Sequence, residues 1–194
     1  YCSRFCCMYS LKHAHQIIEK IPGTIPYLLY MDIRSFGKMY EEFYYRIQDE
    51  GAKFIRGRVA NILEDKATKN LHVYAEDTML NRPIDLEVDM VVLAAAVQPA
   101  AETEKTRKMF GVSCSLDGWL LEAHPKLNPC GTTTAGVFVA GVCQGPKDIP
   151  DSVAQAGAAA LIVKHHDLAL GHVHHQRMPR RGRHGGDPEH RAGR

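Results

Sequence analysis

GVFVAGVCQGPKDIPDSVAQAGAAA, residues 136–160, joins a short apolar run, a turn with two glycines and an alanine-rich segment. The apolar residues 137–140 predict a parallel strand that is buried on both faces. Gly141 and Gly145 carry no Cβ, so the backbone can turn sharply and approach a ligand closely. The pattern predicts a buried strand that leads into a tight turn, as in an α/β protein.

The second half of this stretch has the features of a helix start. Asp148 stands where a helix cap belongs, Pro150 is tolerated in the first turn, and small residues dominate positions 152–164. The unpaired N–H groups and the positive dipole end of such a helix favour a phosphate or the electron-rich pyrimidine edge of a flavin. An ordinary strand–turn–helix crossover in an α/β core is the alternative interpretation.

The order of the residues resembles the C-terminal flavin-binding element of the two-dinucleotide-domain flavoproteins, and QGPKDIPDSVAQAGAAA resembles the A subunits of heterodisulfide reductases. The resemblance implies bound FAD. Where the wider superfamily carries an acidic residue after the Ala-Gly pair, this chain has Val142. Backbone amides of the turn, together with the helix start, are therefore the expected FAD contacts. The candidate residues are Gly141, Val142, Cys143, Gln144, Asp148, Ile149, Pro150, Ser152 and Val153.

A cluster of cysteines lies near the other end, in YCSRFCCMYSLKHA. Cys2, Cys6 and Cys7 are three thiols within six residues, a density that suits a soft metal or an iron–sulfur centre. Reduced cysteines on a helix are the alternative. The segment resembles the part of the heterodisulfide reductase A subunits that holds a [4Fe–4S] cluster. That resemblance implies one more cysteine about a dozen residues upstream, before the first residue of this chain.

The middle of the chain alternates between helical and extended patterns. Residues 27–33 are a strand candidate, and apolar residues at helical spacing across 39–47 predict a helix whose tyrosines and methionines fill a core. Residues 53–63 and 70–76 predict antiparallel strands around a polar turn, and residues 85–96 end in the apolar DMVVLAAA, a predicted buried strand.

This middle run resembles the second nucleotide-binding-like domain of the same superfamily, with Ala96 where members commonly carry a glycine. We expect a partial two-dinucleotide-binding-domain, thioredoxin-reductase-like α/β fold in three layers with a small antiparallel β element. Residues 1–99 are then the second nucleotide-binding-like domain with its cysteine cluster, and residues 100–170 the C-terminal part of the FAD-binding domain. Because GxGxxG is missing, we expect an internal fragment of a longer polypeptide.

Composition separates a globular body from a basic tail. Residues 171–194 contain six arginines against two acidic residues and almost nothing apolar, which predicts disorder. The rest of the sequence contains no apolar run near the ~20 residues of a membrane span. Six cysteines without a secretory signal point to the reducing cytoplasm.

The favoured function is electron transfer, in which FAD exchanges electron pairs and a [4Fe–4S] cluster carries single electrons. The resemblance implies an electron-bifurcating complex with heterodisulfide reductase B and C subunits, ferredoxin, and a hydrogenase or formate dehydrogenase as the electron donor. No side chain is expected to be a catalytic acid or base. The alternative is a zinc-binding module, with His13 and His15 completing the cysteine set and the basic tail contacting nucleic acid.

Overall fold

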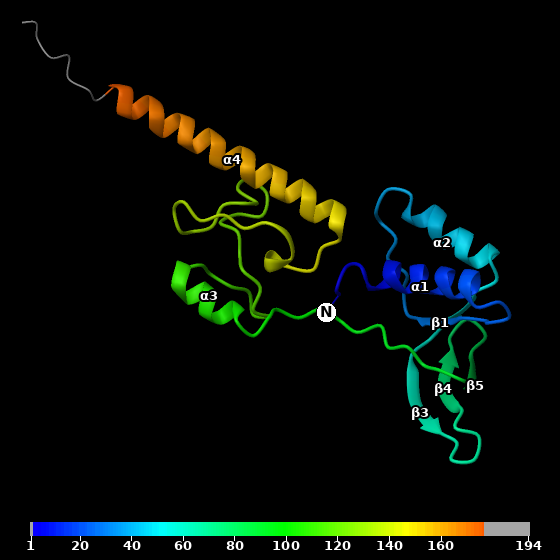
Figure 1. Ribbon diagram of the computed structural model, residues 1–194. Helices are drawn as coiled ribbons and strands as arrows, with labels where there is room; N and C mark the ends of the chain where they lie inside the picture. Colours follow the sequence, from blue (N-terminus) through cyan, green and yellow to red (C-terminus); the bar gives the residue numbers. More distant parts are fainter. Residues whose placement is uncertain (1, 177–194) are drawn as a thin grey trace, which may run out of the picture.

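The computed structural model describes the backbone of residues 2–176 and side chains up to residue 165. The chain is mixed α/β with a small antiparallel sheet, as the sequence predicted. Its elements form two groups, and the segment 89–100, which has no regular secondary structure, runs between them (Figure 1). None of the helices in the described part combines the length and apolarity that crossing a membrane requires.

The first group contains a parallel strand pair covered by two helices. Strands β1 (Tyr27–Tyr30) and β2 (Lys53–Arg56) are joined through helix α2 (Tyr40–Asp49), which confirms the helix predicted there. Helix α1 (Cys6–Lys20) contributes Leu11 to a core shared with Ile47 of α2, and both side chains are fully buried. Burying such an aliphatic side chain contributes about 1.5–3 kcal/mol, so this contact holds the two helices together.

Strands β3 (Val59–Glu64), β4 (Leu71–Asp77) and β5 (Arg82–Val88) form an antiparallel sheet in that order. The sequence predicted one strand over 53–63, whereas the chain breaks it at Gly57. A Cβ at Gly57 would lie 1.7 Å from the Glu76 carbonyl oxygen, and the Gly57 N–H donates to the Tyr30 carbonyl at 2.7 Å. The close backbone approach at Gly57 is what divides the parallel pair from the antiparallel sheet.

The strand predicted over residues 85–96 is correct only for its first part. Strand β5 ends at Val88, and the apolar residues that follow lie in the extended segment, with Met90 74% exposed and Leu93 76% exposed. An apolar run becomes a buried strand only when neighbouring strands satisfy its backbone groups. No such strand lies beside it among residues 2–176.

The second group contains helix α3 (Thr103–Phe110), the short 3₁₀ helix η1 (Gly141–Gln144) and helix α4 (Ile149–Gln176). Helix α3 lies in a region for which the sequence predicted no regular element. The strand predicted over residues 137–140 is wrong, since the chain there makes a single antiparallel bridge, Gly131 to Phe138. The Thr132 N–H donates to the Val137 carbonyl and the Val139 N–H to the Cys130 carbonyl, so this segment pairs with residues 130–132 and not with a parallel strand. Nevertheless Val139 is 3% exposed, so its predicted burial is correct.

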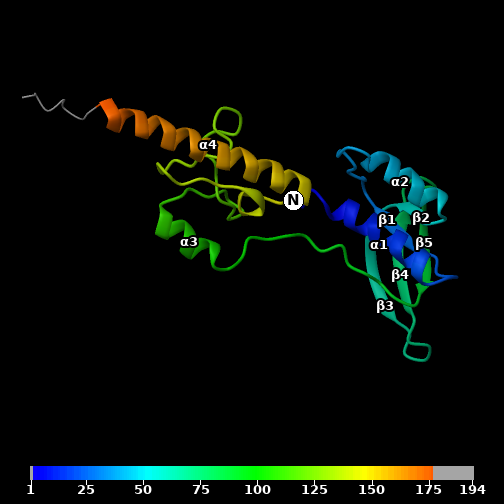
Figure 2. The same cartoon turned by 45° about the horizontal axis from the view of Figure 1, so that its top comes forward.

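Helix α4 is longer than the sequence predicted. The sequence predicts that residues 171–176 belong to the disordered tail, whereas the helix continues through them. The alanine- and leucine-rich sequence after residue 158 favours this continuation. Figure 2 shows the helix extending past the other elements of its group. The remainder of the predicted tail, residues 177–194, lies outside the described residues.

Candidate cofactor site

The cysteine segment is a strained loop that leads directly into α1. Arg4 has a left-handed backbone with φ of 65°, a conformation that a residue with a side chain seldom adopts. Its N–H donates to the Cys2 sulfur at 3.2 Å. Ser3 is buried, and its hydroxyl oxygen accepts the Val97 N–H at 2.8 Å. The helix begins at Cys6.

The three sulfurs of this loop affect one another electrostatically. Burial, followed by the Cys7 and Cys2 sulfurs, raises the pKa of Cys6 above that of an ordinary thiol. The Cys7 thiol contacts the Asp32 carbonyl oxygen at 3.8 Å. A thiolate at Cys6 is therefore less favourable than a thiolate at an ordinary exposed cysteine.

His13 and His15, the two histidines of the alternative zinc set, make their contacts with residues other than the cysteines. The His13 ring lies 5.6 Å from the Tyr9 ring, and the His15 Nδ1 lies 2.6 Å from the Glu50 carboxylate. Among the described residues, no group of three or more histidine, cysteine or acidic side chains has the arrangement of a metal site.

The predicted flavin turn is built around a network of two glutamine side chains. Gly141 adopts φ of 77°, and its N–H donates to the Gln155 Oε1 of α4 at 2.8 Å. The Gln155 amide in turn donates to Gln144 Oε1, and Gln144 donates to Glu122. These bonds fix η1 against α4. Val142 and Cys143 stay exposed on the turn.

Asp148 caps α4, as the sequence predicted. Its Oδ1 accepts the Asp151 N–H at 2.9 Å, and its carbonyl oxygen accepts the Ser152 N–H at 3.0 Å. Pro150 has no N–H, and the Asp151 and Ser152 N–H groups are both bonded to Asp148. Few of the backbone donors expected at this helix start are therefore free for a ligand. The apolar residues Ile149 and Val153 are 80% and 66% exposed one turn apart, forming an apolar surface beside the turn.

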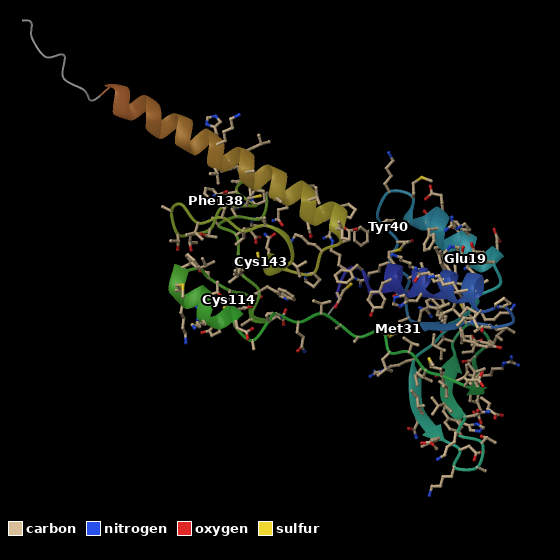
Figure 3. All side chains as sticks on the ribbon, viewed as in Figure 1. Glu19, Met31, Tyr40, Cys114, Phe138 and Cys143 are labelled. Carbon is tan, nitrogen blue, oxygen red and sulfur yellow. The ribbon has the colours of Figure 1, made fainter. Side chains whose placement is uncertain are left out.

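Two long-range contacts join the first group of elements to the start of α4, one from the cysteine loop and one from α2. The Arg4 guanidinium lies 2.6 Å from the Asp151 carboxylate, and the Tyr40 hydroxyl donates to the Asp148 carboxylate at 2.7 Å. Figure 3 shows Tyr40 on the side of the first group that faces α4. The Asp151 N–H and the Tyr40 hydroxyl lower the pKa of Asp148, and the bond to Asp148 raises the pKa of Tyr40.

Several of these residues were missed by the sequence analysis. Arg4 could have been noticed as a cation inside a run of cysteines, whereas Tyr40 was assigned to a core and no local signal marks it. Lys147 is a further cation beside the turn, and its Nζ donates to Gln144 Oε1 at 3.0 Å. Burial, followed by the nearby Arg4 charge, lowers the pKa of Lys147. The arrangement therefore places two cations and two carboxylates at the start of α4.

The structure defines a mixed α/β chain in which a cysteine loop is joined to the start of a long helix by an ion pair. The relatives of the chain make this class more specific. The iron-sulfur A subunit of a CoB–CoM heterodisulfide reductase from Methanocaldococcus jannaschii is 54% identical over 164 residues, 84% of this chain and 25% of the relative. The A subunit of an H₂:CoB–CoM heterodisulfide,ferredoxin reductase from Methanothermobacter thermautotrophicus is 55% identical over 161 residues, 82% of this chain and 24% of the relative.

The A subunit of an H₂/formate:CoB–CoM heterodisulfide,ferredoxin reductase from Methanococcus maripaludis is 50% identical over 164 residues, 84% of this chain and 25% of the relative. No family model matches the chain. Over the matched region the chain belongs to the family of heterodisulfide reductase A subunits, as its sequence predicted. The chain spans about a quarter of the length of these relatives.

Proposed function

We propose that this chain is the part of a heterodisulfide reductase A subunit in which a [4Fe–4S] cluster lies next to FAD. The observation that carries the proposal is the joining of the cysteine loop to the start of α4 by the Arg4–Asp151 ion pair. Similarity to the iron-sulfur component of one such enzyme and to heterodisulfide,ferredoxin reductases supports it. The enzyme to which the chain contributes is an oxidoreductase.

The cysteine loop is chemically suited to an iron–sulfur cluster. Cys2 is exposed, whereas Cys6 and Cys7 are partly buried at the first turn of α1, so one edge of the set is open to an incoming ligand. The raised pKa of Cys6 reflects burial and repulsion between neighbouring sulfurs, which bound iron would relieve. Cys2, Cys6 and Cys7 would supply three thiolates of the four that such a cluster usually takes.

The turn at Gly141 and the start of α4 are suited to a flavin ring. Exposed Val142, Ile149 and Val153 offer an apolar surface beside the turn. Lys147 and Arg4 supply positive charge at the start of α4. When bound, FAD would supply exchange of electron pairs and the cluster exchange of single electrons. The role of the chain is to hold and orient both groups and to balance their charge.

The complete protein that this proposal implies has more parts than the chain shows. We assign residues 1–99 to a nucleotide-binding-like domain that carries the cluster and residues 100–170 to the FAD-binding domain, within a partial two-dinucleotide-binding-domain fold. The proposed complex bifurcates electrons in the cytoplasm, with B and C subunits, ferredoxin, and a hydrogenase or formate dehydrogenase. The names of the relatives mention ferredoxin, H₂ and formate, which supports this choice of partners.

The cluster assignment is tested by Cys6→Ser in a full-length family member whose aligned segment is replaced by this chain, hereafter the grafted protein. We expect loss of iron and sulfide and of the reduced-cluster EPR signal, because a hydroxyl is a poor ligand for iron. Cys114→Ser, in the second group, is the matched control and should keep both. Retention of four irons by the Cys6 variant, or zinc without iron or flavin in the grafted protein, would contradict the proposal.

The flavin assignment is tested separately by inserting one alanine between Pro150 and Asp151. The insertion rotates Val153 and the rest of α4 by about 100° relative to Ile149 and the turn, so the apolar surface no longer faces one ligand. We expect FAD to be lost or its potential to fall. An alanine inserted between Lys66 and Ala67, in the exposed turn after β3, should change neither. Unchanged FAD content and potential after the first insertion would show that the helix start is only structural.

A further inference from the structure

Arg4 contacts both candidate cofactor elements, one through its backbone and the other through its side chain. Its N–H lies 3.2 Å from the Cys2 sulfur, and its guanidinium lies 2.6 Å from the Asp151 carboxylate in the first turn of α4. The same guanidinium lies 5.0 Å from the centre of the Phe36 ring. A single residue therefore links the cysteine loop to the start of α4.

The backbone at Arg4 is held in its unusual conformation by the surrounding loop. A left-handed backbone is strained for a residue with a side chain, and glycine is the usual choice at such a position. The Phe5 N–H bonds to the Ser3 carbonyl at 2.7 Å, and the Ser3 hydroxyl holds the Val97 N–H. These bonds direct the Arg4 N–H toward the Cys2 sulfur. Hydrogen bonds to cluster sulfurs are among the features that set cluster potentials.

The side chain of Arg4 has an electrostatic effect at the other end. Asp148 and Asp151 place two carboxylates at the start of α4, and Arg4 is the cation in direct contact with Asp151. Without Arg4, that carboxylate would add uncompensated negative charge beside the expected pyrimidine edge of the flavin. Because reduction adds negative charge to that edge, the reduced flavin would become less favourable.

We propose that Arg4 is a positioning residue that couples the two cofactor elements, holding the Cys2 sulfur through its N–H and neutralising Asp151 at the flavin through its guanidinium. The role rests on the proposed function, because it requires a cluster at the cysteine loop and FAD at the turn. It adds that the charge at residue 4 changes the flavin potential through Asp151.

The test is a double-mutant cycle on the flavin midpoint potential of the grafted protein, measured by spectroelectrochemical titration. Arg4→Ala should lower the potential, and Asp151→Asn in the same protein should restore it toward the unsubstituted value. Since both side chains are nearly half exposed, the expected effect is about two- to fivefold in the flavin redox equilibrium. Arg4→Gly, which suits the left-handed backbone, provides a second variant with less risk to folding.

Arg58→Ala is the matched control, because Arg58 is an exposed arginine between β2 and β3 and should leave the potential unchanged. A structural role alone would predict lost cofactor without rescue by Asp151→Asn. Two outcomes would overturn the role of Arg4 while leaving the proposed function intact. One is an equal flavin potential in the cofactor-loaded unsubstituted protein and in its Arg4→Ala and Arg4→Gly variants. The other is a strictly additive effect of Arg4→Ala and Asp151→Asn on that potential. Absence of flavin and iron from the unsubstituted grafted protein would overturn both.

Discussion

The hydrogen bond between Tyr40 and Asp148 should measurably stabilise the contact between the two groups of elements. Removing it with Tyr40→Phe should lower the free energy of unfolding by about 1 kcal/mol. A carboxylate acceptor strengthens the bond, whereas the partial exposure of the site weakens it. Asp148→Ala should cost about 2 kcal/mol, since it removes the same bond and also the cap on the Asp151 N–H, worth about 1 kcal/mol.

The double variant distinguishes a direct contact from two independent effects. Once Asp148 is alanine, the Tyr40 hydroxyl has no carboxylate to bind, so adding Tyr40→Phe should cost little more than the single Asp148 variant. The expected coupling between the two sites is about 1 kcal/mol. The free energy of unfolding is measured on the 194-residue chain by urea denaturation, followed by far-UV circular dichroism. Additive losses in the double variant would refute the contact.

The same coupling should depend on pH in a defined direction. The folded-state pKa of Asp148 is lowered, so its contribution is fully present above the ordinary aspartate pKa of about 3.9 and is lost as pH falls through the lower folded value. At pH 7 the coupling should be complete. Repeating the cycle at successively lower pH should show it declining only below about pH 4. A coupling that persists unchanged in stronger acid would argue against an ionised acceptor.

Three further predictions concern two glycine positions and the reactivity of one thiol. Gly57→Ala should destabilise the chain by more than about 2 kcal/mol, because its Cβ would overlap the Glu76 carbonyl oxygen, and an undiminished free energy of urea unfolding would contradict this. Gly157→Ala, with nothing within 4 Å of the new Cβ, should instead stabilise α4 by up to about 1 kcal/mol in the same assay. Near pH 8, Cys6 should alkylate more slowly than exposed Cys2, because its pKa is raised; mass spectrometry showing equal rates would be inconsistent with this.

Patterns that depend on neighbouring residues predicted much of the local structure. The helix at α2 and the cap at Asp148 both formed where the sequence placed them. Capping and helical periodicity act over one or two turns of chain, so they can be read from a short window. The burial of Val139 was also predicted correctly, because its apolar neighbours indicate an interior position.

The predicted buried strand over 137–140 and the part of the predicted 85–96 strand after Val88 did not form, and the reason is the same for both. Strand formation depends on a partner that supplies backbone hydrogen bonds, and an apolar run contains no information about whether that partner is present beside it. Gly57 shows the reverse case, since a continuous strand pattern is interrupted by the approach of Glu76 from another strand. Gly57 can be read from the sequence, but the approach of the Glu76 carbonyl that requires a glycine there cannot.

The sequence by itself determined the chemical groups of the candidate site: the cysteines at 2, 6 and 7, the glycine turn at 141 and the cap at 148. Only the tertiary structure decided that Arg4 of the cysteine loop and Tyr40 of α2 reach the start of α4. Arg4 contacts Asp151 across 147 positions of sequence, and Tyr40 contacts Asp148 across 108. Such contacts depend on how the intervening helices and strands pack. Side chains so far apart in the chain come within hydrogen-bonding distance only when the whole fold brings them together.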